Sequence, residues 1–166
     1  MLIVLLLAQV APGWPWAGAA NPRAHVLALR ATTVMDERWS GKPVRLRFTV
    51  TDVPACHATT GLYGAVADRK DRCTRLSRLA VSVNGRALPL SARAYRDLGG
   101  IDDVVVRPSP TRLLIFIRGP DGPDYYGATL AIDARGGVRR RLDSADGATR
   151  ITRYARRQGA RERQRS

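Results

Sequence analysis

The chain of 166 residues has little cysteine, histidine or aromatic residue, and each scarcity excludes a class of protein. Two cysteines are too few for a miniprotein built on disulfides or for a four-cysteine zinc module. Two histidines, His25 and His57, leave little material for a histidine-rich metal centre. Aromatic residues form 6% of the chain, so bases of a nucleic acid have few rings on which to stack.

Motifs that identify common enzymes are also missing. The sequence has no GxSxG, no HExxH, no glycine-rich phosphate loop before a helix and no EF-hand spacing. His57, Asp102 and Tyr63 stay as candidates for an unfamiliar catalytic site. The pair Cys56-His57 offers two metal ligands with no cluster of acids or histidines around it.

Two acidic sites have simpler structural interpretations than functional ones. Asp102 and Asp103 resemble a carboxylate pair for acid–base work, but neighbours on a strand point to opposite faces, so a turn before Val104 is the simpler interpretation. Residues 121–124 (Asp-Gly-Pro-Asp) resemble half a calcium site, and a plain hairpin loop explains them better. We expect no cofactor.

The N-terminus has the pattern of a secretory signal peptide over residues 1–20. An apolar run from Leu2 to Val10 precedes Ala17-Gly18-Ala19, whose small side chains suit signal peptidase. Pro12 interrupts the run long before the roughly 20 apolar residues that a membrane anchor needs, so we expect no transmembrane segment in the mature chain. The alternative is a buried N-terminal strand. Export predicts a periplasmic or secreted protein.

Export also changes the interpretation of Cys56 and Cys73. In an oxidising compartment two cysteines of a small domain usually pair. A disulfide between them closes a loop of about 17 residues, which is worth about 3 kcal/mol in the chain-entropy model. The alternative is a redox or metal pair, although CxxC spacing is absent.

Strand patterns dominate the rest of the chain. Apolar and polar residues alternate through residues 44–51, a period of two that places the apolar groups on one face. Further strands are predicted over 26–34 (weaker), 79–83, 86–90, 104–107, 112–118, 126–132, 138–142 and 149–154. The pattern predicts one mainly β domain over residues 21–154, a small antiparallel β-sandwich or partly open barrel with one or two short helices.

Turn and helix signals separate these strands. Asn84-Gly85 predicts a tight hairpin, and Pro89 on the returning strand should face an open edge. A turn is predicted over Asp36–Lys42. Short helices are predicted over Thr60–Arg72 and Ala92–Leu98.

The core is predicted from the apolar sides of these strands. Leu113 to Ile117 is apolar on both faces, so that strand is expected to be central and covered on both sides. The expected core residues are Leu46, Phe48, Val50, Val81, Leu114, Phe116, Leu130 and Ile132.

Positive charge is the outstanding compositional feature. Lys+Arg number 28 against 14 Asp+Glu, a net charge of +14, and all the basic residues except Lys42 and Lys70 are arginine. Residues 155–166 form a predicted disordered tail, in which the candidate anion-binding residues are Arg156, Arg157, Arg161, Arg163 and Arg165. A genome rich in G and C is an alternative source of part of this arginine.

The sequence favours a small exported, non-catalytic binding or accessory protein of the cell envelope, with an envelope protein or an anionic envelope polymer as its partner. One alternative is an envelope-surface protein tethered to anionic lipid or polysaccharide by its arginine-rich surface and tail. Another is an exported enzyme of unrecognised type. A nucleic acid partner is not expected, because the aromatic residues do not lie among the basic ones.

The signal-peptide interpretation predicts cleavage near Ala19 or Ala20, because the small residues lie at the positions that signal peptidase reads. Mass spectrometry of the protein from its native host measures the new N-terminus. An intact Met1 in soluble cytoplasmic protein would contradict both the export and the disulfide interpretations.

Overall fold

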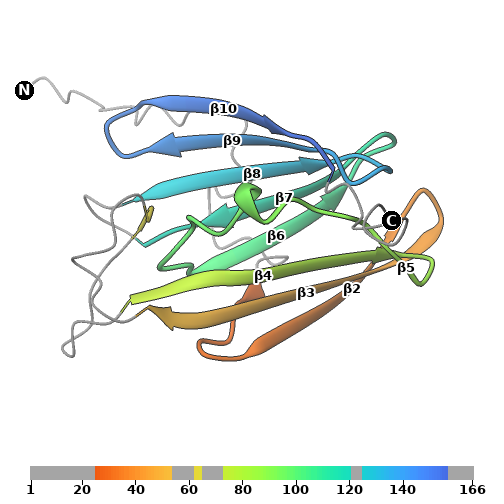
Figure 1. Ribbon diagram of the computed structural model, residues 1–166, viewed down its shortest axis with the longest axis horizontal. Helices are drawn as coiled ribbons and strands as arrows, with labels where there is room; N and C mark the ends of the chain where they lie inside the picture. Colours follow the sequence, from red (N-terminus) through yellow and green to blue (C-terminus); the bar gives the residue numbers. More distant parts are fainter. Residues whose placement is uncertain (1–24, 54–61, 65–72, 121–124, 157–166) are drawn as a thin grey trace, which may run out of the picture.

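The computed structural model describes residues 25–53, 62–64, 73–120 and 125–156, which form a mainly β structure of two antiparallel sheets (Figure 1). The six-stranded sheet has the order β1-β6-β7-β8-β9-β10, and the four-stranded sheet has the order β2-β3-β4-β5. The first contains β1 (His25–Val26), β6 (Asp103–Pro108), β7 (Leu113–Arg118), β8 (Tyr126–Ile132), β9 (Val138–Ser144) and β10 (Thr149–Tyr154). The second contains β2 (Thr32–Trp39), β3 (Lys42–Val53), β4 (Cys73–Val83) and β5 (Arg86–Ala87). The predicted mainly β architecture with antiparallel strands is therefore confirmed.

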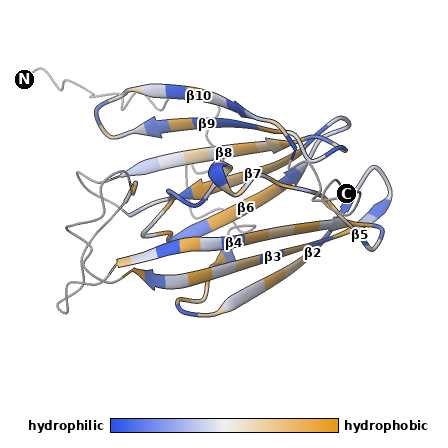
Figure 2. Ribbon diagram, viewed as in Figure 1, coloured by the Kyte–Doolittle hydropathy of each residue, from blue (hydrophilic) through white to orange (hydrophobic). Residues whose placement is uncertain are grey.

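One hydrophobic cluster takes residues from both sheets. It includes six of the eight predicted core residues, namely Leu46, Phe48, Val50, Val81, Leu130 and Ile132. Along β3 the burial alternates as the sequence predicts, with the arginines at 45 and 47 exposed. In Figure 2 the hydrophilic segments of the six-stranded sheet gather on β9 and β10, whereas β6 is mostly hydrophobic.

The prediction for β7 is wrong about the buried face. Leu113, Ile115 and Ile117 are fully buried, whereas Leu114 and Phe116 are only half-buried. Each buried residue of β7 lies opposite a buried residue of β8, as Ile115 lies opposite Leu130. The Arg107 guanidinium lies 6.0 Å from the Phe116 ring centre on the other face. The expected two-sided burial is thus only partial at β7.

Two hairpins have the tight turns that positive φ angles allow. Asn84 and Gly85 have φ of 49° and 77°, which confirms the predicted Asn-Gly hairpin between β4 and β5. Strand β5 (Arg86–Ala87) lies at the edge of its sheet but is shorter than the predicted 86–90, so Pro89 follows the strand instead of lying in it. The turn expected over Asp36–Lys42 is shorter in the structure: β2 continues to Trp39, and only Ser40 and Gly41 (φ 50° and 77°) turn.

Two other boundaries also differ from the prediction. The strand expected over 26–34 is divided between β1 and β2, which belong to different sheets. Asp103 is the first residue of β6 rather than part of a turn, and its buried carboxylate pairs with Arg118.

A β-bulge explains why β4 is longer than its alternation predicts. The register between β3 and β4 shifts after Thr49, so that Val50 lies opposite Leu76 while Phe48 lies opposite Leu79. Ser77 occupies the extra position, and its hydroxyl donates a hydrogen bond to the Thr49 carbonyl (3.1 Å). The bulge allows Leu76 and Leu79, three residues apart, to be buried in one core.

The segment 92–102 connects the two sheets by contacts with both. Its carbonyl at Leu98 accepts a hydrogen bond from the Leu76 amide of β4 (2.9 Å). Its Asp97 carboxylate pairs with Arg140, a guanidinium of β9 whose residue is only 4% exposed. The helix predicted over Ala92–Leu98 is reduced to the single 3-10 turn η2 (Ala92–Ala94), because the carbonyls of Asp97 and Leu98 accept hydrogen bonds from Tyr63 and from Leu76 of β4.

Several predictions fall outside the described residues. These are the signal peptide over 1–20, the partner of Cys73 in the predicted disulfide (Cys56), the loop 121–124, most of the helix predicted over 60–72, and the tail beyond Arg156. In the part of the chain that the structure describes, no helix is long and apolar enough to cross a bilayer.

The buried face of β7 predicts that removing the side chain of Ile115 destabilises the protein more than removing that of Phe116. Ile115→Ala should lower the free energy of unfolding by about 2 to 5 kcal/mol, because it empties fully buried space. Phe116→Ala should cost less than half as much, since its ring is half-buried. Urea unfolding of both variants measures the difference, and a larger loss for Phe116→Ala would contradict the assigned face.

Candidate anion-binding cleft

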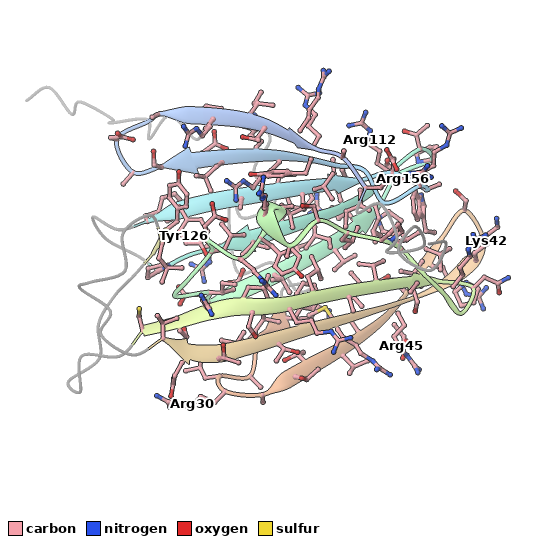
Figure 3. The ribbon with its side chains drawn as sticks, in the orientation of Figure 1. Arg30, Lys42, Arg45, Arg112, Tyr126 and Arg156 are labelled. Carbon is pink, nitrogen blue, oxygen red and sulfur yellow. The ribbon has the colours of Figure 1, made fainter. Side chains whose placement is uncertain are left out.

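One end of the molecule gathers arginines from turns and strands far apart in the sequence. We call it the turn end: it carries the turns at 40–41, 84–85, 109–112 and 133–137 and the residues that follow β10 (Figure 1). A cleft of about 740 Å³ lies there on the six-stranded sheet. We call it the arginine cleft; its charged residues are Arg112, Arg135, Arg139, Arg153, Arg156 and Asp133. Figure 3 shows Arg112 and Arg156 side by side at this end, with Arg30 at the opposite one.

Strands β9 and β10 place two of these arginines directly opposite each other. Residues Val138, Arg140 and Leu142 face the core, so the alternation of β9 turns Arg139 outward. Arg139 pairs in register with the exposed Arg153 of β10. Like charges directly opposite on a sheet repel, so this pair costs stability unless an anion lies between the two guanidinium groups.

The β8–β9 turn supplies a rigid wall of the cleft. The Asp133 carboxylate accepts hydrogen bonds from the backbone amides of Arg135 (2.8 Å) and Gly137 (2.9 Å). Gly136 has a φ of 86°, and a side chain there would meet Pro89 at 2.9 Å, so the turn is packed against the other sheet. Arg135 is therefore held on a fixed backbone.

Positive charge in the cleft is left without a carboxylate partner among the described residues. Asp133, the one acid among the described lining residues, accepts hydrogen bonds at Oδ1 from backbone amides, and five arginines against one carboxylate give the lining a charge of +4. Some arginines of the sheets do have such a partner: Arg45 pairs with Asp36 at 2.7 Å, and this hydrogen bond lowers the pKa of the Asp36 carboxyl. Arg141, two residues from Arg139 on β9, pairs with Asp143. What distinguishes the cleft is that five guanidinium groups line one hollow.

This arrangement suits an oxyanion with several acceptor oxygens. A guanidinium presents its N–H donors in a planar fork that matches phosphate and carboxylate oxygens, often with two hydrogen bonds. Tyr154, the last residue of β10, is half-buried and also lines the cleft. Its ring lies 5.5 Å from the Arg140 guanidinium, and this cation–π contact holds the end of β10 in place. In chemical terms the cleft can bind and orient an anion.

The structure brings one of the predicted anion-binding residues into this site. Arg156 lines the cleft, whereas Arg157, Arg161, Arg163 and Arg165 lie outside the described residues. Sequence reasoning missed the other four arginines of the cleft, since they are scattered through two turns and two strands. The alternation of β9, read together with the register of its hairpin, is the signal that could have found Arg139 and Arg153.

Of the candidate catalytic residues, Tyr63 and Asp102 both lie in the surroundings of the buried Tyr126. His25 lies exposed in β1, while His57 lies outside the described residues. The amide of Asp102 donates to the Arg118 carbonyl (3.0 Å). Tyr63 accepts a hydrogen bond from Arg150 (3.5 Å) at the end opposite the cleft.

Beside Tyr63 lies the buried Tyr126, with 6.3 Å between the two ring centres. Its hydroxyl donates a hydrogen bond to the Gly99 carbonyl (2.8 Å). Burial, aided by the charges of Asp97 and Asp102, raises the pKa of Tyr126 far above its usual range. This phenol therefore stays protonated as a structural donor.

Metal-ligating side chains do not cluster in the described ranges, where no group of three or more His, Cys, Asp or Glu is assembled. Cys73 is buried at the start of β4, far along the chain from the cleft. The disulfide between Cys56 and Cys73 stays a prediction.

Because Arg139 lies opposite Arg153, reversing one of the two charges should stabilise the folded protein. Arg153→Glu should raise the free energy of unfolding by about 0.5 kcal/mol over the control Arg78→Glu, which faces the neutral Thr49. The gain should shrink at about 0.5 M salt because exposed charges are then screened. Urea unfolding at both ionic strengths checks this, and equal stabilities of the two variants would contradict it.

Comparison with known proteins identifies no relative: no protein-family model, no curated protein and no solved structure matches the chain. The arginine cleft is therefore interpreted from its own residues, charge and register.

Proposed function

We propose that this chain is an exported, non-catalytic binding protein of the cell envelope whose arginine cleft holds anionic groups of an envelope polymer or lipid. The observation that carries the proposal is the convergence of five arginines on one cleft, where Asp133 is the only acid among the described lining residues. Phosphate and carboxylate groups are the anions that such a set of guanidinium groups recognises.

The placement of the cleft supports a large ligand over a small enclosed one. The cleft lies on an outer face at the edge of the six-stranded sheet, and its arginines Arg135, Arg139, Arg153 and Arg156 are exposed. An extended polyanion or a membrane surface can reach such a site without a lid. Because the contacts are between exposed charges, the affinity should fall with ionic strength.

Export and a disulfide belong to the same proposal. The N-terminal pattern predicts a secreted chain, and a disulfide between Cys56 and Cys73 would suit that compartment. We also propose that the two sheets pack as an open sandwich, since their buried residues form one cluster. The four tail arginines that follow Arg156 in the sequence would add to the positive charge of the protein.

A vesicle-binding assay tests the proposal. The double variant Arg139→Gln/Arg153→Gln should bind vesicles of anionic phosphatidylglycerol about 30-fold more weakly than the parent at low ionic strength, because each lost charge contributes about 1 kcal/mol near such a surface. Vesicles of neutral phosphatidylcholine should bind neither protein. Isothermal titration with pyrophosphate gives a vesicle-free measure of the same site.

The control is the double variant Arg47→Gln/Arg78→Gln, which removes the same charge from the outer face of β3 and β4. Equal losses in the two double variants would show that net charge alone drives binding and would overturn the cleft. Truncation after Arg156 removes four tail arginines and Glu162, a net charge of +3, and so measures the tail apart from the cleft.

A further inference from the structure

A second cavity opens at the turn end, next to the arginine cleft. It measures about 670 Å³, and we call it the tryptophan pocket. Its apolar lining comes from both sheets and their turns: Trp39, Val83, Leu88, Pro110 and Ala134. A cavity of this size with an apolar lining is typical of a small-ligand site.

Trp39 forms a fixed wall of this pocket. The residue is 5% exposed, and its indole Nε1 donates a hydrogen bond to the Ser109 carbonyl (2.8 Å). The neighbouring Ser40 hydroxyl donates to the Pro110 carbonyl (3.3 Å), which ties the β2–β3 turn to the β6–β7 loop. The apolar surface is therefore held in place before any ligand arrives, and little ordering entropy is lost on binding.

The pocket and the cleft share their dividing wall. Thr111 lines the pocket and Arg112 lines the cleft, while Ala134 lines the pocket between Asp133 and Arg135 of the cleft. Residues that are neighbours in the chain therefore line the two cavities at two turns, so the cavities adjoin there. A molecule with an anionic group next to an apolar chain can reach both.

Charge at the pocket mouth has the same sign as in the cleft. Lys42 and Arg86 line the pocket, and no carboxylate is among its lining residues in the described chain. Figure 3 shows Lys42 at the same end of the molecule as Arg112 and Arg156. An apolar ligand with an anionic head would therefore be attracted from both sides of the pocket.

From these observations we infer that the tryptophan pocket binds the hydrocarbon chain of an anionic amphiphile whose phosphate or carboxylate head lies in the arginine cleft. This inference rests on the proposed function and narrows its ligand to one with an apolar chain attached to the anion. A membrane lipid and a free alkyl phosphate share this chemistry. The protein would then distinguish an acylated anion from a plain polyanion.

Alkyl phosphates of increasing length test the pocket. The probes are butyl, hexyl and octyl phosphate, with octyl glucoside as the neutral amphiphile and pyrophosphate as the anion without a chain. Isothermal titration of the full chain should give one site whose affinity rises about fourfold per added methylene until the pocket is full. Octyl glucoside should bind at least tenfold more weakly than octyl phosphate.

Two kinds of variant locate the chain and the head. Ala134→Phe fills the pocket from an exposed position and should weaken octyl phosphate at least tenfold more than it weakens pyrophosphate. Thr111→Phe repeats the test from the β6–β7 loop if the first variant fails to fold. With Trp14 and Trp16 replaced by phenylalanine, the emission of Trp39 should shift with octyl phosphate and stay unchanged with pyrophosphate.

The outcomes separate this inference from the function on which it rests. Pyrophosphate binding with no dependence on chain length, or with no effect of Ala134→Phe on octyl phosphate, would overturn the amphiphile and leave the anion site standing. Two independent sites for octyl phosphate would overturn the inference that one ligand occupies both cavities.

Binding of octyl glucoside alone, without pyrophosphate binding, would overturn the proposal that the arginine cleft binds anions. Pure phosphatidylglycerol vesicles binding as well to Ala134→Phe as to the parent would assign a free amphiphile rather than a membrane lipid.

Discussion

Burial of the apolar faces of both sheets in one core determines on which side of each strand the charges lie. Because side chains alternate along a strand, the arginines next to core residues on β3 and β9 are turned outward. Arg140 lies on the inward face of β9, where Asp97 and the ring of Tyr154 stabilise its buried guanidinium. Removing one partner of such a buried pair costs several kcal/mol in other proteins, so the segment 92–102 is firmly attached to the six-stranded sheet.

The arginine cleft follows from this constraint and from the hairpin register. Once Val138 and Leu142 are buried, Arg139 has to face outward, and the pairing of β9 with β10 then sets it opposite Arg153. The Asp133 turn adds Arg135 on a backbone that is already hydrogen-bonded. None of these arginines needs a carboxylate for folding, which leaves their donors available to a ligand. The adjacent tryptophan pocket arises where the same turns meet the other sheet.

Local sequence signals predicted what short-range physics decides. The Asn84-Gly85 turn needs positive φ at two residues, and the alternation in β3 gives its buried face directly. The face of β7 could not be predicted in this way, because Leu113 to Ile117 is apolar throughout and only its register with β8 decides. The bulge at Ser77 was hidden for a related reason: one extra residue breaks the period of two. The cleft itself depends on strand pairing, which a single sequence does not specify.

Strand β10 forms an edge of the six-stranded sheet, so its arginines bear on whether two copies of the protein can associate through this edge. An exposed edge is a template on which a second chain can add a strand, and Ile151 is an exposed apolar residue on this one. The exposed Arg150 and Arg153 would make two such edges repel each other. On the proposed function, a polyanion bound in the cleft would neutralise part of that repulsion. Occupancy of the cleft and self-association at the β10 edge would then be coupled through the same charges.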